Sequence, residues 1–258
     1  MKSASADMNG ICVHRKATTA STNLDARAGT HGDVYAADFQ TAGRGRLDHE
    51  WHAAAGENLM FSAVLGVAGR EPAEVATLPL VAGLAVAKAV SPLLPEDARA
   101  SLGIKWPNDV LLGGRKLAGI LCERNGDHVI AGIGINVNQM EFPPEIAERA
   151  TSLSMACGGA LSRDEVLALT LDALYAAHAT WREGGFAAFR REFTKYDLLA
   201  GKVVSIRQTD DDPAPVTGSC GGVQADGTLL VGGEAIHAGE AHVLSVGRAL
   251  AGNARGVI

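Results

Sequence analysis

Lys116-Leu117-Ala118-Gly119-Ile120-Leu121 decides the fold, because it opens an apolar run over residues 116–123. A second apolar run follows at residues 129–137. Runs that are apolar at nearly every position are typical of strands buried on both faces. The sequence therefore predicts two paired strands near the centre of a sheet.

Further strands are expected before this pair. Short apolar runs predict them at residues 11–14, 34–39, 58–65, 104–106 and 110–112. Gly113-Gly114 favours a two-residue turn between the last of these and residues 116–123. These segments predict a sheet that several parts of the chain build together.

Three helical segments are also expected. Residues 73–94 carry apolar side chains at helical spacing, and residues 78–90 read as a buried helix. Another helix should begin near Ser162, because Glu165 stands three residues later, which is a capping-box spacing. A last helix is predicted over residues 186–199, around two phenylalanines.

The pattern changes after Gly201. Several short strand-like runs follow: residues 203–206, 216–219, 228–231, 235–237 and 242–246. Many short strands within about 50 residues are typical of a small β-barrel or sandwich. We expect a domain boundary there, with residues 1–200 and 201–258 as the two domains and residues 210–213 as an exposed loop.

Charge argues against a nucleic-acid partner. The 258 residues carry a formal net charge of −6 and no run of five like charges. Affinity for phosphate backbones depends on clustered Lys and Arg, so we expect no nucleic acid as a partner.

Cysteine usage and hydropathy indicate a cytoplasmic protein without a membrane segment. The four cysteines (Cys12, Cys122, Cys157 and Cys220) lie far apart, with no C-x-x-C pair, and read as reduced thiols. Residues 1–10 lack the apolar core of a signal peptide. The most apolar stretch, residues 78–90, is too short to span a bilayer.

A loop rich in glycine and arginine is the first candidate for chemistry. Gly43-Arg44-Gly45-Arg46 is followed by Trp51. Glycines let a backbone approach a ligand, arginines bind phosphate or carboxylate, and an aromatic ring can cover an adenine. The segment therefore suits a lid over an anionic ligand, although a surface turn with two solvated arginines would look the same.

Lys105-Trp106-Pro107-Asn108-Asp109 is the second candidate. Asn108 and Asp109 would present oxygens at the end of a strand. An acid beside an amide suits a magnesium ion that also holds triphosphate oxygens. An ordinary Pro-Asn-Asp turn is the alternative.

The central strands themselves carry the third and fourth candidates. Lys116, at the start of an apolar strand, could stabilise a transition state at an α-phosphate, and Gly119 would leave room for a ligand against the sheet. Gly132, Gly134 and Asn136 share one face that has almost no side-chain bulk. Such a face suits a ligand floor. A strand-edge lysine with its amine in water remains the alternative for Lys116.

Ser21-Thr22-Asn23 is the last candidate. Three short polar residues before a helix are usually a cap, but they could also bind a neutral head such as a urea.

The joint order of these motifs resembles the biotin–protein ligase family over residues 18–138. The resemblance implies an α/β (α+β) catalytic domain on a mixed β-sheet with flanking helices, followed by a small SH3-like β-barrel. It also implies a ligase that uses Mg²⁺, biotin and ATP to form biotinyl-5′-AMP. Biotin then passes to a lysine of a biotin carboxyl carrier protein, such as that of acetyl-CoA carboxylase.

The resemblance assigns roles to residues of this chain. Those implied for biotin are Ser21, Thr22, Asn23, Gln40, Gly43, Arg44, Lys116, Gly119 and Leu121. Those implied for ATP and the adenylate are Arg46, Trp51, Lys105, Asn108 and Asn136. Lys116, Arg44 and Arg46 would act in catalysis, and Asp109 would bind Mg²⁺.

Two features set this chain apart within the resemblance. Leu47-Asp48-His49-Glu50 places two acids where the family often has more glycine and arginine, which bears on how tightly the loop holds the adenylate. Only 20 residues precede Ser21, so we expect a short form without the N-terminal DNA-binding domain of regulatory ligases.

Other functions are weighed against this one. A lipoate–protein ligase shares the fold and the adenylation chemistry. A non-catalytic biotin or nucleotide sensor would keep ligand contacts but lose Lys116 or the magnesium residues. A transcriptional regulator would bind DNA. The resemblance also allows a homodimer formed through an exposed sheet edge.

Overall fold

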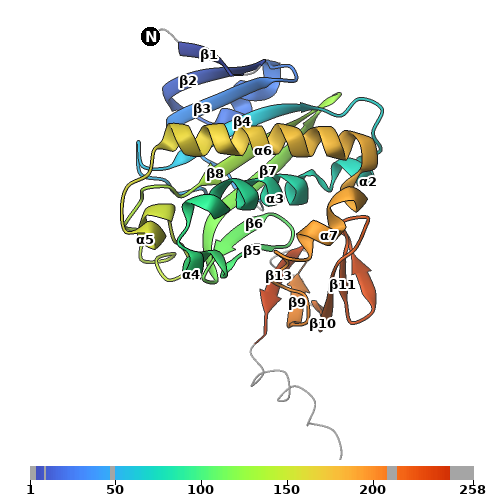
Figure 1. Cartoon of the computed structure of the whole chain (residues 1–258). Coiled ribbons are helices and arrows are strands. Elements are labelled where there is room, and N and C mark those ends of the chain that lie inside the picture. The colour runs from blue at the N-terminus through green and yellow to red at the C-terminus, as the bar shows by residue number, and fades with distance from the viewer. Residues whose placement is uncertain (1–3, 9, 47–49, 208–213, 245–258) are drawn as a thin grey trace, which may run out of the picture.

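The computed structural model describes residues 4–8, 10–46, 50–207 and 214–244. An eight-stranded sheet and a five-stranded sheet organise the chain (Figure 1). The larger sheet has the order β1-β2-β3-β4-β8-β7-β6-β5. Its strands are β1 Ala4–Met8, β2 Ile11–Thr19, β3 Asp33–Gln40, β4 Leu59–Gly66, β5 Leu102–Lys105, β6 Asp109–Leu112, β7 Arg115–Asn125 and β8 His128–Ile135.

The predicted mixed sheet is confirmed. Strands β2 and β3 pair in parallel, and the other neighbours pair antiparallel. The two decisive strands, β7 and β8, lie between β4 and β6, as their apolar content predicted. Gly113 and Gly114 form the predicted turn, with φ angles of 58° and 76° that glycine adopts without strain. Strand β1 was not predicted.

Helices cover one face of this sheet. In Figure 1, α3 (Leu78–Val90) and the long α6 (Arg163–Gly184) lie side by side in front of the strands. The Oγ of Ser162 caps α6 by accepting a hydrogen bond from the backbone N–H of Glu165, so the predicted start is confirmed. The predicted segment 73–94 divides into most of α2 (Pro72–Val75), the helix α3 and a 3₁₀ turn (Ser91–Leu93).

Helix α3 is the buried helix that the sequence predicted. Residues 72–93 are long and apolar enough to cross a membrane by length and composition alone. However, 72% of the most apolar window is buried inside the protein. Nearly every side chain of α3 packs in the core beneath α6, which accounts for its apolar character.

The helix predicted over residues 186–199 is wrong in extent. A 3₁₀ turn (Phe186–Phe189) leads into α7 (Arg190–Phe193), and the helix ends there. Beyond it, the N–H of Ile104 donates to Tyr196 O (2.6 Å) and the N–H of Leu198 donates to Ile104 O (3.0 Å). The edge strand β5 thus offers hydrogen bonds that hold this segment extended.

The second sheet has the order β12-β11-β10-β9-β13. Each predicted run overlaps one of its strands: β9 Val203–Arg207, β10 Val216–Val223, β11 Leu229–Val231, β12 Glu234–Ile236 and β13 Glu240–Val243. Strand β10 ends four residues later than predicted, and β13 begins two residues earlier. No hydrogen-bonded ladder joins β12 to β13 among the described residues, so no closed barrel is found. The loop predicted at residues 210–213 lies outside the described residues.

Candidate active site

A cleft opens on the face of the large sheet opposite α3 and α6. The space between its walls, including the part open to solvent, is about 1100 Å³. Many of the residues predicted for the site line it: Ser21, Thr22, Asn23, Gln40, Arg44, Arg46, Trp51, Lys105, Asn108, Asp109, Lys116, Gly119 and Leu121. Gly43 and Asn136 lie outside its lining.

One end of the cleft is built from hydroxyl and amide side chains. The Oε1 of Gln40 accepts hydrogen bonds from the backbone N–H of Thr22 (2.7 Å) and from its Oγ1 (3.1 Å). Ser62 Oγ lies 2.7 Å from Thr22 Oγ1 and 2.6 Å from Asn23 Oδ1. We call Thr22, Asn23, Gln40 and Ser62 the amide end.

The short helix α1 (Thr22–Asp25) brings these residues together. Ser21, Thr22 and Asn23 are at most 6% exposed, and Ser62 on β4 is fully buried. Ser21 stands at the N-cap position, but its side chain makes no capping hydrogen bond. A cap is therefore not the role of this hydroxyl, which leaves it free to meet a ligand.

The floor of the cleft consists of paired glycines. Gly119 on β7 lies opposite Gly134 on β8, and Leu121 lies opposite Gly132. A Cβ at Gly134 would stand 2.5 Å from the ring of Trp51, and one at Gly119 would stand 3.1 Å from it. The ring of Trp51 therefore packs against the floor so closely that a Cβ at Gly134 would collide with it. The predicted bare strand face is confirmed for Gly132 and Gly134.

Lys116 and Asp109 form an ion pair beside this ring. Their Nζ and Oδ1 atoms are 2.8 Å apart, and Lys116 Nζ lies 5.7 Å from the centre of the Trp51 ring. The side chain of Lys116 is 38% exposed, so its amine faces the cleft rather than the core. A cation over an aromatic face is held by the ring as well as by the carboxylate.

Asn136 holds the backbone of Lys116 in place. It is buried, and its Nδ2 donates to the backbone oxygens of Lys116 (3.3 Å) and Thr151 (3.0 Å). The backbone N–H of Lys116 also donates to Arg149 O (2.7 Å). These contacts fix the start of β7, so in this structure Asn136 acts on the position of Lys116.

The arginine-rich loop closes on itself over the cleft. The N–H of Trp51 donates to Gly43 O (3.1 Å). The backbones of Arg44 and Glu50 pair in an isolated antiparallel β-bridge. Gly43 is buried, and a Cβ there would stand 3.0 Å from Trp51 O. Leu47, Asp48 and His49 lie outside the described residues, so the departure noted there has no structural description.

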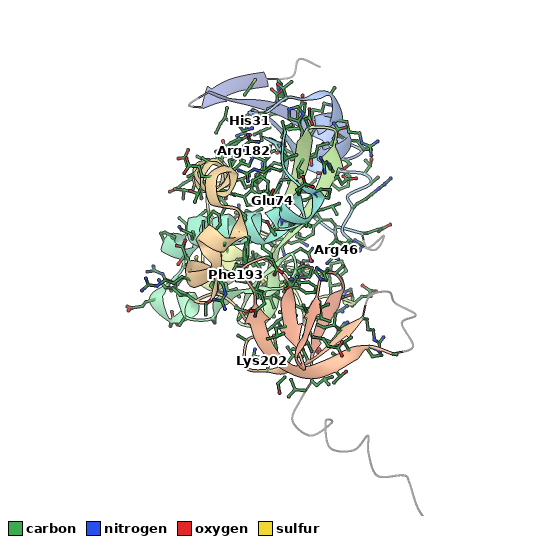
Figure 2. The ribbon with its side chains drawn as sticks, turned by 90° about the vertical axis from the view of Figure 1, so that its right-hand side faces the viewer. His31, Arg46, Glu74, Arg182, Phe193 and Lys202 are labelled. Atoms are coloured by element: carbon green, nitrogen blue, oxygen red, sulfur yellow. The ribbon has the colours of Figure 1, made fainter. Side chains whose placement is uncertain are left out.

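Arg46 joins the cleft to the second sheet (Figure 2). Its Nη1 donates to Asn108 Oδ1 (3.3 Å) and to Gly239 O (3.2 Å). Burial lowers the pKa of Arg46, while Asp109 and Glu240 act in the opposite direction. The guanidinium therefore lies among acceptors and acids at the junction of the two sheets.

The second sheet contributes one lining residue, Glu240. Its Oε1 lies 3.9 Å from Lys105 Nζ. We call Arg46, Lys105, Asp109, Lys116 and Glu240 the charged end. Sequence reasoning missed Glu240, Glu123 and Ser62, because a single polar residue in a strand gives no motif.

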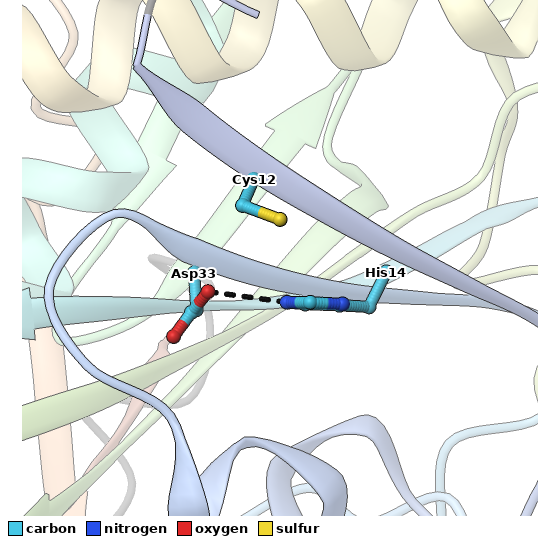
Figure 3. A group of neighbouring side chains, drawn as sticks. All are labelled: Cys12, His14 and Asp33. Carbon is cyan, nitrogen blue, oxygen red and sulfur yellow. Dashed lines mark hydrogen bonds and ion pairs between the residues drawn. The ribbon is translucent and has the colours of Figure 1, made fainter. Parts of the chain in front are cut away.

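Two places could be considered for a metal ion. Asp109 offers one carboxylate beside Lys116, which suits an ion that brings most of its ligands with it. Cys12, His14 and Asp33 offer ligand atoms within 4.8 Å of one another (Figure 3). However, Asp33 is satisfied by His14 Nε2 (3.1 Å) and by Thr30, so this group has the geometry of an ion pair beside a thiol.

Comparison with known proteins places the chain in a family. Residues 10–139 match the model of the biotin/lipoate A/B protein ligase family. The bifunctional ligase/repressor BirA of Bacillus subtilis is 34% identical over 207 residues, covering 78% of this chain and 61% of BirA. The chain thus spans about three fifths of the length of the first relatives it matches.

Two further relatives match nearly along their whole length. The biotin–[acetyl-CoA-carboxylase] ligase of Paracoccus denitrificans is 34% identical over 235 residues, covering 85% of this chain and 93% of that ligase. A structure of the biotin protein ligase from Aquifex aeolicus in complex with biotin and ATP has a TM-score of 0.79 and 32% identity, covering 90% of this chain and 98% of that one. With its motifs gathered in one cleft, the chain belongs to the biotin/lipoate A/B protein ligase family.

Proposed function

We propose that this chain is a biotin–protein ligase: it activates biotin with ATP and transfers it to a lysine of a carrier protein. The observation that carries the proposal is the division of one cleft into an amide end and a charged end. Strand β7 runs between them, with Lys116 at its start and Leu121 and Glu123 further along. A substrate with a neutral polar ring and a carboxylate fits such a cleft along its length.

The amide end would hold the ureido ring of biotin. Hydroxyl and amide groups match a neutral head that both donates and accepts hydrogen bonds. Ser21, Thr22, Asn23 and Gln40 would make these contacts, and Gly119 and Leu121 would line the slot beside the ring. The carboxylate of biotin would then extend toward Lys116.

The first half-reaction would take place at the charged end. A carboxylate oxygen of biotin attacks the α-phosphorus of ATP, the bond from that phosphorus to the bridging oxygen breaks, and pyrophosphate leaves. Negative charge builds between carboxylate and phosphate, where the ammonium of Lys116 would stabilise it. Arg44 and Arg46 would offset phosphate charge, with Gly43 allowing the loop to close.

The nucleotide would be held by the groups around Trp51. Its ring would cover the adenylate, and Lys105 and Asn108 would contact ATP. Asn136 was expected to touch the nucleotide directly; its contacts favour support of Lys116 instead.

Magnesium would be held by Asp109 together with oxygens of the nucleotide. The single carboxylate fits an ion that keeps phosphate and water ligands. When bound, Mg²⁺ would supply positive charge to the leaving pyrophosphate. Asp109 would have to exchange its pairing with Lys116 for this role, which would release the lysine toward the substrate carboxylate.

In the second half-reaction, the amine of a carrier lysine attacks the carbonyl carbon of biotinyl-5′-AMP. The bond to the phosphate oxygen breaks, AMP leaves, and the amine loses a proton. The partner would be a biotin carboxyl carrier protein, as in acetyl-CoA carboxylase, in the cytoplasm. Residues 201–258 would form a separate SH3-like domain after the catalytic residues 1–200, and a homodimer through a sheet edge stays a prediction.

Product analysis tests the proposal. The chain is incubated with MgATP and either biotin or lipoate, and the products are separated and identified by mass spectrometry. We expect biotinyl-5′-AMP and pyrophosphate in the reaction with biotin, and no adenylate in the reaction with lipoate. A lipoyl adenylate alone would assign the chain to lipoate activation, and binding of biotin without any adenylate would indicate a sensor.

A further inference from the structure

The Asn23 side chain is held between two strands of the cleft floor. Its Nδ2 lies 3.4 Å from Leu121 O and hydrogen-bonds to Glu123 Oε2. Its Oδ1 lies 2.6 Å from Ser62 Oγ. Asn23 is only 6% exposed, so these contacts are shielded from water and fix the side chain.

The chemistry of these partners decides which way the amide points. The two ends of an asparagine amide have nearly the same shape, and the hydrogen-bond partners distinguish them. A backbone oxygen and an ionised carboxylate can only accept, so the NH₂ group must face Leu121 and Glu123. The oxygen of Asn23 then faces the hydroxyl of Ser62, which can donate.

Gly132 leaves the space that this oxygen occupies. A Cβ at position 132 would collide with Asn23 Oδ1. Because both residues line the cleft, the oxygen lies against its floor, near the ligand space. This oxygen accepts from Ser62 Oγ (2.6 Å), and as a carbonyl oxygen it has a second lone pair for a donor on a ligand ring above the floor.

Glu123, a partly exposed residue that lines the cleft, holds the Asn23 amide in this orientation. One of its oxygens contacts Asn23, while the other lies 4.0 Å from Arg27 Nη2. Its side chain is 41% exposed, so the carboxylate stays in contact with water. Lys116 stands at the opposite end of β7, so Glu123 is remote from the phosphate chemistry.

We propose that Glu123 is a positioning residue for substrate selection. Its carboxylate keeps the Asn23 oxygen beside Ser62 and over Gly132 on the cleft floor, and the site thereby selects an acid whose far end carries N–H donors. A urea ring has two such donors, whereas a dithiolane ring has none. The Asn23 oxygen already accepts from Ser62, and a urea N–H can bind its second lone pair, so the acid that brings this donor binds more tightly. This inference rests on the proposed activation of biotin.

The test uses the full chain with Glu123→Gln, and Glu148→Gln as a matched control at an exposed glutamate. Glutamine can donate to the Asn23 oxygen, so the reversed amide becomes accessible. The steady-state constants of biotin-dependent pyrophosphate exchange are measured for biotin and for an analogue in which oxygen replaces one ureido N–H.

We expect Glu123→Gln to raise the KM for biotin about 10- to 100-fold, as for a lost hydrogen bond to a charged group. The kcat and the KM for ATP should stay within about twofold, because Lys116 is untouched. The preference for biotin over the oxygen analogue should fall at least about tenfold, which a loss of packing alone would not produce. The control should match the wild type.

A second variant distinguishes loss of the acceptor charge from a general disturbance of the fold. Glu123→Asp keeps the acceptor charge, and should lose less of the preference for N–H donors than Glu123→Gln. An unchanged biotin KM and preference in Glu123→Gln, or equal losses in both variants, would overturn the inference while leaving the proposed function intact. A wild-type chain without biotin-dependent exchange would instead overturn the proposed function itself.

Discussion

The two ends of the cleft are built in different ways. At the amide end, Thr22, Asn23 and Ser62 are at most 6% exposed, and they hydrogen-bond to one another and to neighbouring strands. At the charged end, the side chains of Lys116 and Glu240 are 38% and 37% exposed, and each is paired with another charge of the protein. One end is thus set before a ligand arrives, while the other must exchange partners.

This difference follows from the chemistry of each end. Buried hydroxyls and amides have fixed directions, because an unmatched polar group away from water is costly. Exposed ion pairs contribute little to stability, so an anionic ligand can displace a protein carboxylate from a lysine at small cost. The amide end suits selection, and the charged end suits a reaction in which charge moves.

The largest effect should come from Lys116→Ala. Losing one well-placed stabilising donor costs roughly 10²–10³ in rate, so biotin-dependent adenylate formation should fall by that factor. Pyrophosphate exchange measures it, with thermal unfolding to check the fold and Lys195→Ala as a control at an exposed lysine. Adenylate formation at the wild-type rate would remove Lys116 from the mechanism.

A smaller loss is expected from Gly134→Ala. The added Cβ would stand 2.5 Å from Trp51, so the ring must shift from the position in which it would cover the adenylate. Overpacking costs of about 1–3 kcal/mol correspond to a drop of roughly 5- to 150-fold in kcat/KM for ATP. Gly159→Ala is the matched control, since a Cβ there meets nothing within 4 Å. Equal activity of the two variants would mean that the contact of Trp51 with the floor is not needed.

Salt should separate the two ends. Raising ionic strength from about 0.1 M to 1 M shortens the Debye length from about 10 Å to 3 Å, which weakens attraction between exposed charges. The KM for ATP should rise several-fold, whereas binding of a neutral biotin ester, measured by calorimetry, should hardly change. Parallel salt dependence of both ligands would show that the contrast between the ends is wrong.

The smallest effect is expected from Glu240→Gln. Its carboxylate lies 3.9 Å from Lys105 Nζ, where it would compete with the triphosphate of ATP. An exposed pair is worth about 0–1 kcal/mol, so the KM for ATP should fall by no more than about fivefold. A rise in this KM would indicate that Glu240 instead holds Lys105 in a productive position.

The sequence predicted those parts of the fold that local patterns encode. Apolar runs gave β7 and β8, Gly113-Gly114 gave their neighbouring turn, and Ser162 with Glu165 marked the start of α6. The helix predicted to reach residue 199 failed, because residues 196–198 find hydrogen bonds on the edge of β5 that no local pattern records.

The site was predictable only where its residues form motifs. The paired glycines and Lys116 stand in recognisable stretches, and the structure brings them into one cleft. Ser62 and Glu123 are single polar residues in strands, and their importance comes from hydrogen bonds to Asn23 of the helix α1. Glu240 reaches the cleft only because the second sheet packs against the first.

The most direct test of this account is exchange of labelled pyrophosphate into ATP by the wild-type chain, with magnesium and with either biotin or lipoate. The account predicts exchange that depends on biotin and is absent with lipoate, because the amide end selects the ring and the charged end performs the adenylation. Exchange with lipoate alone, or no exchange from a folded chain that binds biotin, would contradict it.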